Sequence, residues 1–104
     1  MNRAQLLFAS LSFIASQSLA EVDISRQHEL MYLLKQDCGS CHGMTLKGGL
    51  GPSLLPEALD GKPTELLIST ILEGRENTAM PAWNAMLTHE ETEWIVIQLQ
   101  QGVN

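Results

Sequence analysis

The segment that most constrains the fold of this chain is Cys38-Gly39-Ser40-Cys41-His42, which contains both of its cysteines. Two cysteines separated by two residues occur in zinc sites, in thioredoxin-like redox pairs and in small structural disulfides. A zinc site needs four ligands, and His28 and His89 are single histidines on separate expected helices. A thioredoxin-like pair follows a strand, and the chain shows no strand-like alternation. A disulfide that closes so short a loop would constrain the chain very little.

The histidine directly after the second cysteine separates these possibilities. Cys-x-x-Cys-His is the attachment motif of c-type haem. We expect Cys38 and Cys41 to form thioethers with the two vinyl groups of the porphyrin. His42 would then lie beneath the ring as the proximal iron ligand. The sequence therefore predicts one covalently bound haem c, which would also stabilise a chain too short to bury a large core.

The first twenty residues have the pattern of a secretory signal peptide. Arg3 is followed by an apolar run from Leu6 to Ile14 and by a polar stretch that ends in Ser18-Leu19-Ala20, a typical cleavage site. The run is shorter than the roughly 20 residues that cross a bilayer. We expect cleavage after Ala20, a periplasmic location without stable membrane insertion, and one mature domain of residues 21–104. The alternatives are a buried first helix or an uncleaved anchor.

Three main helices joined by glycine-rich loops are expected in the mature domain, which makes the fold class all-α. Asp23 or Ser25 can cap the first helix, Thr64 the second, and Thr88 the third, where Glu91 completes a capping box. The expected helices are 23–36, 65–73 and 89–101, and the expected loops and turn are 43–56, 75–81 and 60–63. Loops this long in a small domain usually wrap something, and here we expect them to wrap the haem.

The sixth iron ligand must come from a distant segment, because residues beside His42 cannot reach the opposite haem face. We expect Met80, since Pro81 fixes φ and removes an N–H, which keeps this segment from coiling into a helix. Met86 is the main alternative, and an open or His-filled position is another. Of the two remaining methionines of the domain, we expect Met31 to fill the core. Met44 is too close in sequence to His42 to reach the opposite haem face.

Four further residues are candidates for the haem pocket. The carbonyl of Pro52 can accept the ring N–H of the ligating histidine, which fixes the tautomer, although an ordinary turn is the simpler interpretation. Leu54 can pack on the proximal side. Trp83 can cover a haem edge or belong to the plain core. Arg75 can pair with a haem propionate or remain a solvated cation.

The charge balance is acidic, with twelve Asp and Glu against six Lys and Arg. This balance argues against nucleic acid as a partner, because nucleic acid requires basic patches. It permits a redox partner with a basic face, but the acids can equally serve only solubility. The sequence contains no recognisable constellation of nucleophile, acid and base. We therefore expect an electron-transfer protein and not an enzyme.

Together these features resemble class I cytochrome c over residues 21–104. In that family a first helix leads into Cys-x-x-Cys-His, a Gly-Pro-x-Leu loop follows, and a Met-Pro loop precedes the last helix. The resemblance implies that the first and last helices cross, that His42 and Met80 are axial, and that one haem edge is exposed. The chain departs from the family at Leu30, where a glycine is common, and at Gln98, where an aromatic residue is expected.

The segments 36–52 and 78–81 are similar to the NirC-type small periplasmic cytochromes c of denitrifying bacteria. This resemblance implies a monomeric single-electron carrier in nitrite reduction, with the haem-c, haem-d nitrite reductase as its partner. The alternative that it implies is a partner in maturation of haem d, which would dock to a haem-d-handling protein and reduce it. A third hypothesis, an enzyme or gas sensor with a labile Met80, also stays open.

Overall fold

The computed structural model describes residues 21–103 together with Ser10 and Ser12. The rest of the expected signal peptide lies outside the described residues, and its cleavage stays a prediction. The described part is helical without any strand, which confirms the all-α fold class. Its elements are α1 (Ile24–Leu33), the π-helical segment η1 (Leu34–Cys38), α2 (Gly39–His42), α3 (Pro56–Leu59), α4 (Thr64–Glu73) and α5 (His89–Gln101).

The first helix is longer than the sequence predicted. Asp23 caps it as expected, since its side chain accepts a 2.9 Å hydrogen bond from the backbone N–H of Arg26. The helix does not end at Gln36 but continues through the wider turns of η1 and through α2 to His42. Gly43 ends the run with a φ of 90°, a conformation that glycine adopts without strain. The cysteine motif is therefore part of one continuous helical run.

The other two main helices begin and end close to their predicted limits. Around α5 the predicted capping box is present: the hydroxyl of Thr88 accepts from the backbone N–H of Glu91, and the Glu91 carboxylate accepts from the backbone N–H of Thr88. The prediction that Thr64 caps α4 is wrong. Pro63 holds the N-cap position, and the Thr64 hydroxyl instead accepts a 3.1 Å hydrogen bond from the Gln100 side chain. Tertiary contact with α5 thus takes the place of a local cap.

The short helix α3 was not predicted: the expected loop ends at Pro56, the expected turn begins at Asp60, and the residues between them had no assignment. Pro56 is its first residue, a position where proline costs nothing because the missing N–H would be unpaired. Leu59 is buried, and α3 packs against α5. A helix of four residues is too short to show a periodic pattern in the sequence. It becomes apparent only in the folded molecule, where it packs against α5.

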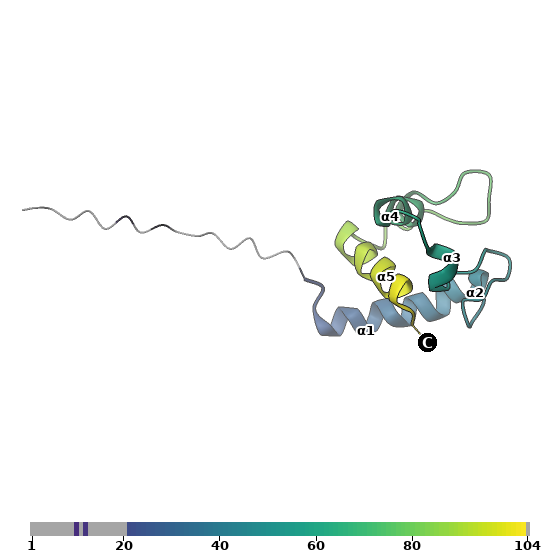
Figure 1. The fold of residues 1–104 in the computed structure, drawn as a ribbon, viewed down its shortest axis with the longest axis horizontal. Helices are drawn as coiled ribbons and strands as arrows, with labels where there is room; N and C mark the ends of the chain where they lie inside the picture. Colours follow the sequence, from purple (N-terminus) through teal and green to yellow (C-terminus); the bar gives the residue numbers. More distant parts are fainter. Residues whose placement is uncertain (1–9, 11, 13–20, 104) are drawn as a thin grey trace, which may run out of the picture.

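The core forms where α5 crosses α1 and packs against α4 (Figure 1). Leu30 and Leu34 of the first helical run are completely buried, although Ile24 near its start is 71% exposed. Burial of one such leucine contributes about 1.5–3 kcal/mol. The other buried apolar side chains are Leu46, Leu59, Ile68, Leu87, Ile95, Val96 and Leu99. Within the described part, no helix is sufficiently long and apolar to span a membrane.

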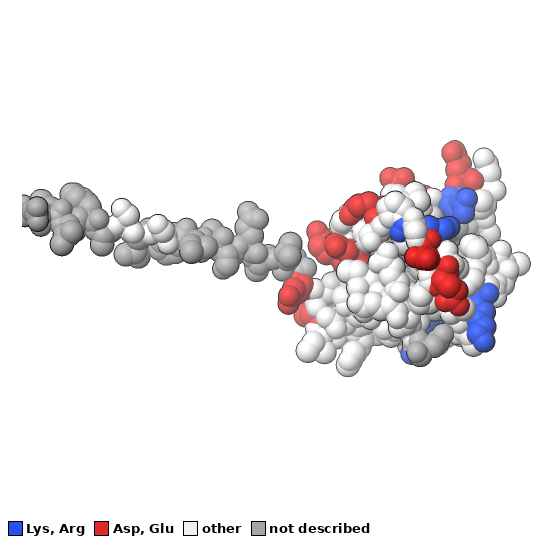
Figure 2. All heavy atoms as spheres, in the orientation of Figure 1, with Lys and Arg blue, Asp and Glu red and all other residues white. Residues whose placement is uncertain are grey.

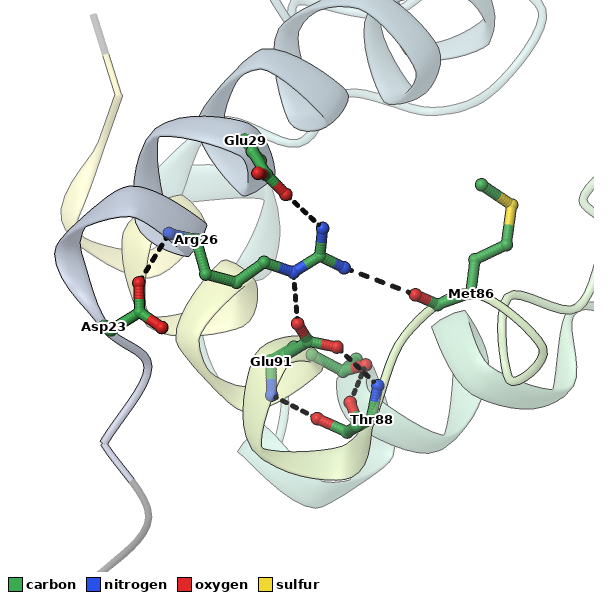
Figure 3. Close-up of polar contacts among 7 residues, drawn as sticks. Asp23, Arg26, Glu29, Met86, Thr88 and Glu91 are labelled. Carbon is green, nitrogen blue, oxygen red and sulfur yellow. Dashed lines mark hydrogen bonds and ion pairs between the residues drawn. The ribbon is translucent and has the colours of Figure 1, made fainter.

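Arg26 connects α1 to the start of α5 (Figure 3). Its guanidinium group donates to the carboxylates of Glu91 and Glu29 and to the backbone carbonyl of Met86, at 3.4 Å in the last case. The Arg26 hydrogen bond, followed by the bond from the Thr88 backbone, lowers the pKa of Glu91. One arginine therefore anchors the capping box of α5 and the turn that precedes it.

We expect Glu91→Gln to lower the free energy of unfolding by about 1–2 kcal/mol, because it weakens both the ion pair and the capping box. Since the folded-state pKa of Glu91 is depressed, this stability is present above the unfolded pKa of about 4.3 and is lost as the pH falls through the folded-state pKa. Urea unfolding of the complete protein at pH 7 and in acid measures both effects. The control is Glu29→Gln, because the Glu29 side chain is 63% exposed while that of Glu91 is 16% exposed. An equal loss in both variants, or a pH-independent loss for Glu91→Gln, would contradict the assignment.

Candidate haem site

The two cysteines lie one helical turn apart at the end of the first helical run. Cys38 is the last residue of η1, and Cys41 lies in α2. Residues three apart in a helix lie on the same face, so both thiols can approach one edge of a ligand. The cysteines are half-buried and form no disulfide. Burial, with a smaller effect from the Asp37 carboxylate, raises the pKa of the Cys38 thiol to about 11, which keeps it protonated at neutral pH.

His42 is oriented by the predicted hydrogen bond to Pro52. The ring Nδ1 lies 2.7 Å from the Pro52 carbonyl oxygen. A carbonyl can only accept, so Nδ1 donates the proton and Nε2 keeps its lone pair. A histidine that donates one ring N–H to a fixed carbonyl is the usual arrangement of a metal ligand.

The loop after α2 is folded tightly around the histidine ring. Gly51 donates a 2.8 Å hydrogen bond to the Cys41 carbonyl, and Gly48 donates one of the same length to the His42 carbonyl. A Cβ atom on Gly51 would lie 2.7 Å from Nδ1 of His42, which is too close for any side chain. Gly51 is therefore required for the ring to reach Pro52. This role of Gly51 was not predicted from the sequence, because the ring of His42 comes close to it only in the folded chain.

The expected distal ligand lies in the loop between α4 and α5. Met80 is half-buried there, and its backbone carbonyl accepts a 3.2 Å hydrogen bond from the N–H of Arg75. The rival Met86 is 61% exposed, and Met44 is 63% exposed. This loop and the loop after α2 project at the same end of the molecule (Figure 1).

The remaining pocket candidates have different environments. Trp83 and Leu54 are half-buried and pack against the core. Part of the Trp83 side chain therefore belongs to the core, which was one of its two expected roles. Leu54 also lines an apolar cavity of about 180 Å³ that none of the proposed haem ligands borders. The Arg75 side chain is exposed. The pocket roles of these residues stay predictions.

The residues of this site fit a covalently attached haem. Two free thiols lie one turn apart, Nε2 of His42 is available as a ligand, and Gly51 keeps space beside the ring. An all-helical domain with this site defines the class of c-type cytochromes.

Comparison with known proteins agrees with this class. The family model for subunit III of cbb3-type cytochrome c oxidase matches residues 25–97. Cytochrome c55X of Pseudomonas aeruginosa is 54% identical over 80 residues, which are 77% of this chain and 67% of that protein. The solved structure of the c-type cytochrome NirC superimposes with a TM-score of 0.77 at 53% identity, covering 78% of this chain and 95% of the other. The chain belongs to the c-type cytochrome family that contains cytochrome c55X and NirC.

A segment of a larger protein is also similar. The dihydro-heme d1 dehydrogenase of Pseudomonas aeruginosa is 36% identical over 70 residues, which are 67% of this chain but only 14% of that protein. Family membership confirms the predicted electron-transport function and the predicted cofactor, a covalently bound haem c. When bound, that haem supplies a one-electron ferrous–ferric couple.

Proposed function

We propose that this protein is a periplasmic single-electron carrier whose partner is the haem-c, haem-d nitrite reductase of denitrification. In this proposal Cys38 and Cys41 hold the haem, while His42 and Met80 are the axial iron ligands. The observation that supports it best is the 2.7 Å contact between Nδ1 of His42 and the Pro52 carbonyl. That contact makes Nε2 the free nitrogen, beside two thiols one turn apart.

The chain's residues have separate tasks in this function. Pro52 holds the His42 ring in one tautomer and orientation, which also raises the basicity of Nε2. A thioether ligand from Met80 favours the ferrous state and so raises the reduction potential. If His42 and Met80 both hold the iron, no coordination position would remain open for a substrate, which is why we propose a carrier and not an enzyme.

The comparisons do not favour the alternative of a maturation partner. The relative whose name refers to haem d shares only a segment that makes up 14% of its length with this chain. The rest of that dehydrogenase has no counterpart here. Both proposals nevertheless involve transfer of an electron to another protein, so one experiment must separate them.

Deletion of the gene in a denitrifying host separates the two functions. For an electron carrier, nitrite reductase purified from the deletion strain should contain normal amounts of haem d, and nitrite turnover in cells should fall. When the reduced cytochrome is mixed with purified reductase in a stopped-flow experiment, the cytochrome should become oxidised. Reductase that lacks haem d after deletion, together with no transfer in vitro, would contradict the carrier function and support the maturation function.

The charges around the Met80 loop predict how docking depends on salt. Acidic side chains lie along the left and upper margins of the visible face and in one group to the right of its centre, whereas the visible cations lie mainly on the half with α2, α3 and the loop after α4 (Figure 2). Glu73 and Glu76 flank the start of the Met80 loop, and both are exposed. If the partner presents a basic face, these two carboxylates contribute to attraction near the haem.

Reversal of Glu73 and Glu76 to lysine should slow second-order electron transfer to the reductase by about tenfold at low salt. The effect should shrink at high salt, because the screening length is about 8 Å at physiological ionic strength and shorter above it. Stopped-flow rates across a salt series measure this. Reversal of Glu90 and Glu93, which are exposed in the first turns of α5, makes the same change in net charge and is the matched control. If both double variants transfer electrons at the wild-type rate, or if the rates do not depend on salt, the acids serve solubility alone.

A further inference from the structure

The segment that contains Met80 leaves α4 and returns to the same end of that helix. The carbonyls in the last turn of a helix have no partner within the helix. Here the backbone N–H groups of Trp83 and Asn84 donate to two of them, those of Ile71 and Leu72, at 3.1 and 3.2 Å. The position of Met80 is therefore set by how closely the outgoing and returning arms of this loop approach each other.

The two arms make contact at Gly74. This residue ends α4 with φ 70° and ψ −169°, a combination that is nearly restricted to glycine. A Cβ atom at position 74 would lie 2.7 Å from the carbonyl carbon of Pro81 and 2.8 Å from both the Ala82 nitrogen and the Met80 oxygen. All three are backbone atoms of the returning arm. They cannot rotate away as the end of a side chain could.

We propose that Gly74 is a positioning residue for the Met80 thioether, because only glycine lets the returning arm of the loop pass close enough to α4. The inference rests on the proposed role of Met80 as an axial ligand. An ordinary contact with a Cβ atom begins near 3.4 Å, so alanine would displace the backbone around Met80 by about 0.7 Å. A ligand must be held within about 0.5 Å of its productive position. The displacement that alanine at position 74 would cause is larger than this tolerance.

Gly61 provides a matched control for the backbone effect. It also has a positive φ, 73°, but a Cβ atom there would meet no heavy atom within 4 Å. Alanine at position 61 thus introduces a left-handed residue without a steric clash and outside the Met80 loop. A difference between the two alanine variants therefore cannot come from the positive φ alone.

The experiment compares the haem-loaded forms of Gly74→Ala, Gly61→Ala, Met80→Ala and the double variant Gly74→Ala/Met80→Ala. The readouts are the thioether-to-iron charge-transfer band of the ferric protein and the rate of cyanide binding. Gly74→Ala should lose most of the band and bind cyanide about tenfold faster, while Gly61→Ala should resemble the wild type. In the Met80→Ala background, Gly74→Ala should add nothing, since no thioether remains to be displaced.

Several results would overturn the inference. One is a normal band in Gly74→Ala while Met80→Ala has lost it, and another is an equal loss in Gly61→Ala. Faster cyanide binding when Gly74→Ala is added to Met80→Ala, or a haem-loaded Gly74→Ala protein that is not helical by circular dichroism, would show general loosening instead of positioning. A band that survives in Met80→Ala would reject the ligand assignment itself, and with it this inference, whereas the first two results would leave that assignment intact.

Discussion

Replacement of both Cys38 and Cys41 by serine is expected to produce a protein without covalent haem that does not fold. The domain is small, the 75–81 loop is almost entirely exposed, and Met44 and Leu50 of the 43–56 loop are exposed as well. Without the group that they wrap, the conformational entropy of those loops is no longer offset. We expect most of the helical circular dichroism signal to disappear and the yield of exported protein to fall steeply.

The two single variants serve as graded controls for this prediction. Each retains one thioether, so each should keep haem at reduced yield and with reduced stability toward urea. Intact-mass measurements distinguish protein with and without haem, and circular dichroism reports the fold of each. A double variant that is free of haem and yet fully helical would show that the polypeptide core is sufficient by itself.

Met80→Ala is expected to keep the haem attached but to open the sixth coordination position. The thioether-to-iron charge-transfer band should vanish, and carbon monoxide should bind readily to the ferrous protein. The reduction potential should fall by more than about 100 mV, because the thioether that stabilises the ferrous state is gone. Absorption spectra and a redox titration measure these changes.

Met86→Ala is the control for this variant, because Met86 is the rival ligand and its side chain is 61% exposed. It should leave the band and the potential unchanged. Loss of the band in Met86→Ala but not in Met80→Ala would transfer the assignment to Met86. Carbon monoxide binding by the wild-type protein, together with a weak band, would instead support the hypothesis of a gas sensor or enzyme with a labile Met80.

Features determined by neighbouring residues were predictable from the sequence. The Asp23 cap, the capping box of Thr88 and Glu91, and the glycine that ends each of α4 and α5 all depend on residues a few positions apart. So does the Cys-x-x-Cys-His motif, which needs only one helical turn to bring its thiols to one face. The contact between His42 and Pro52 was also predictable, because the nine residues between them form a glycine-rich loop with few ways to return to the histidine ring.

Features that depend on packing between distant segments were not predictable. The helix α3 and the pairing of Thr64 with Gln100 both involve contact with α5. The Arg26 contacts with Glu91 and Met86 join residues more than fifty positions apart. No local pattern encodes such pairs.

The class of protein follows from five consecutive residues, because the attachment of haem c requires two thiols and an imidazole at the spacing that these residues show. The places where backbone must approach backbone become apparent only in the folded molecule. Gly51 against the ring of His42 and Gly74 against the returning arm of the Met80 loop are indistinguishable from other loop glycines in the sequence. The physical reason is that the need for glycine arises from atoms of another segment, and those atoms are near only after the chain has folded.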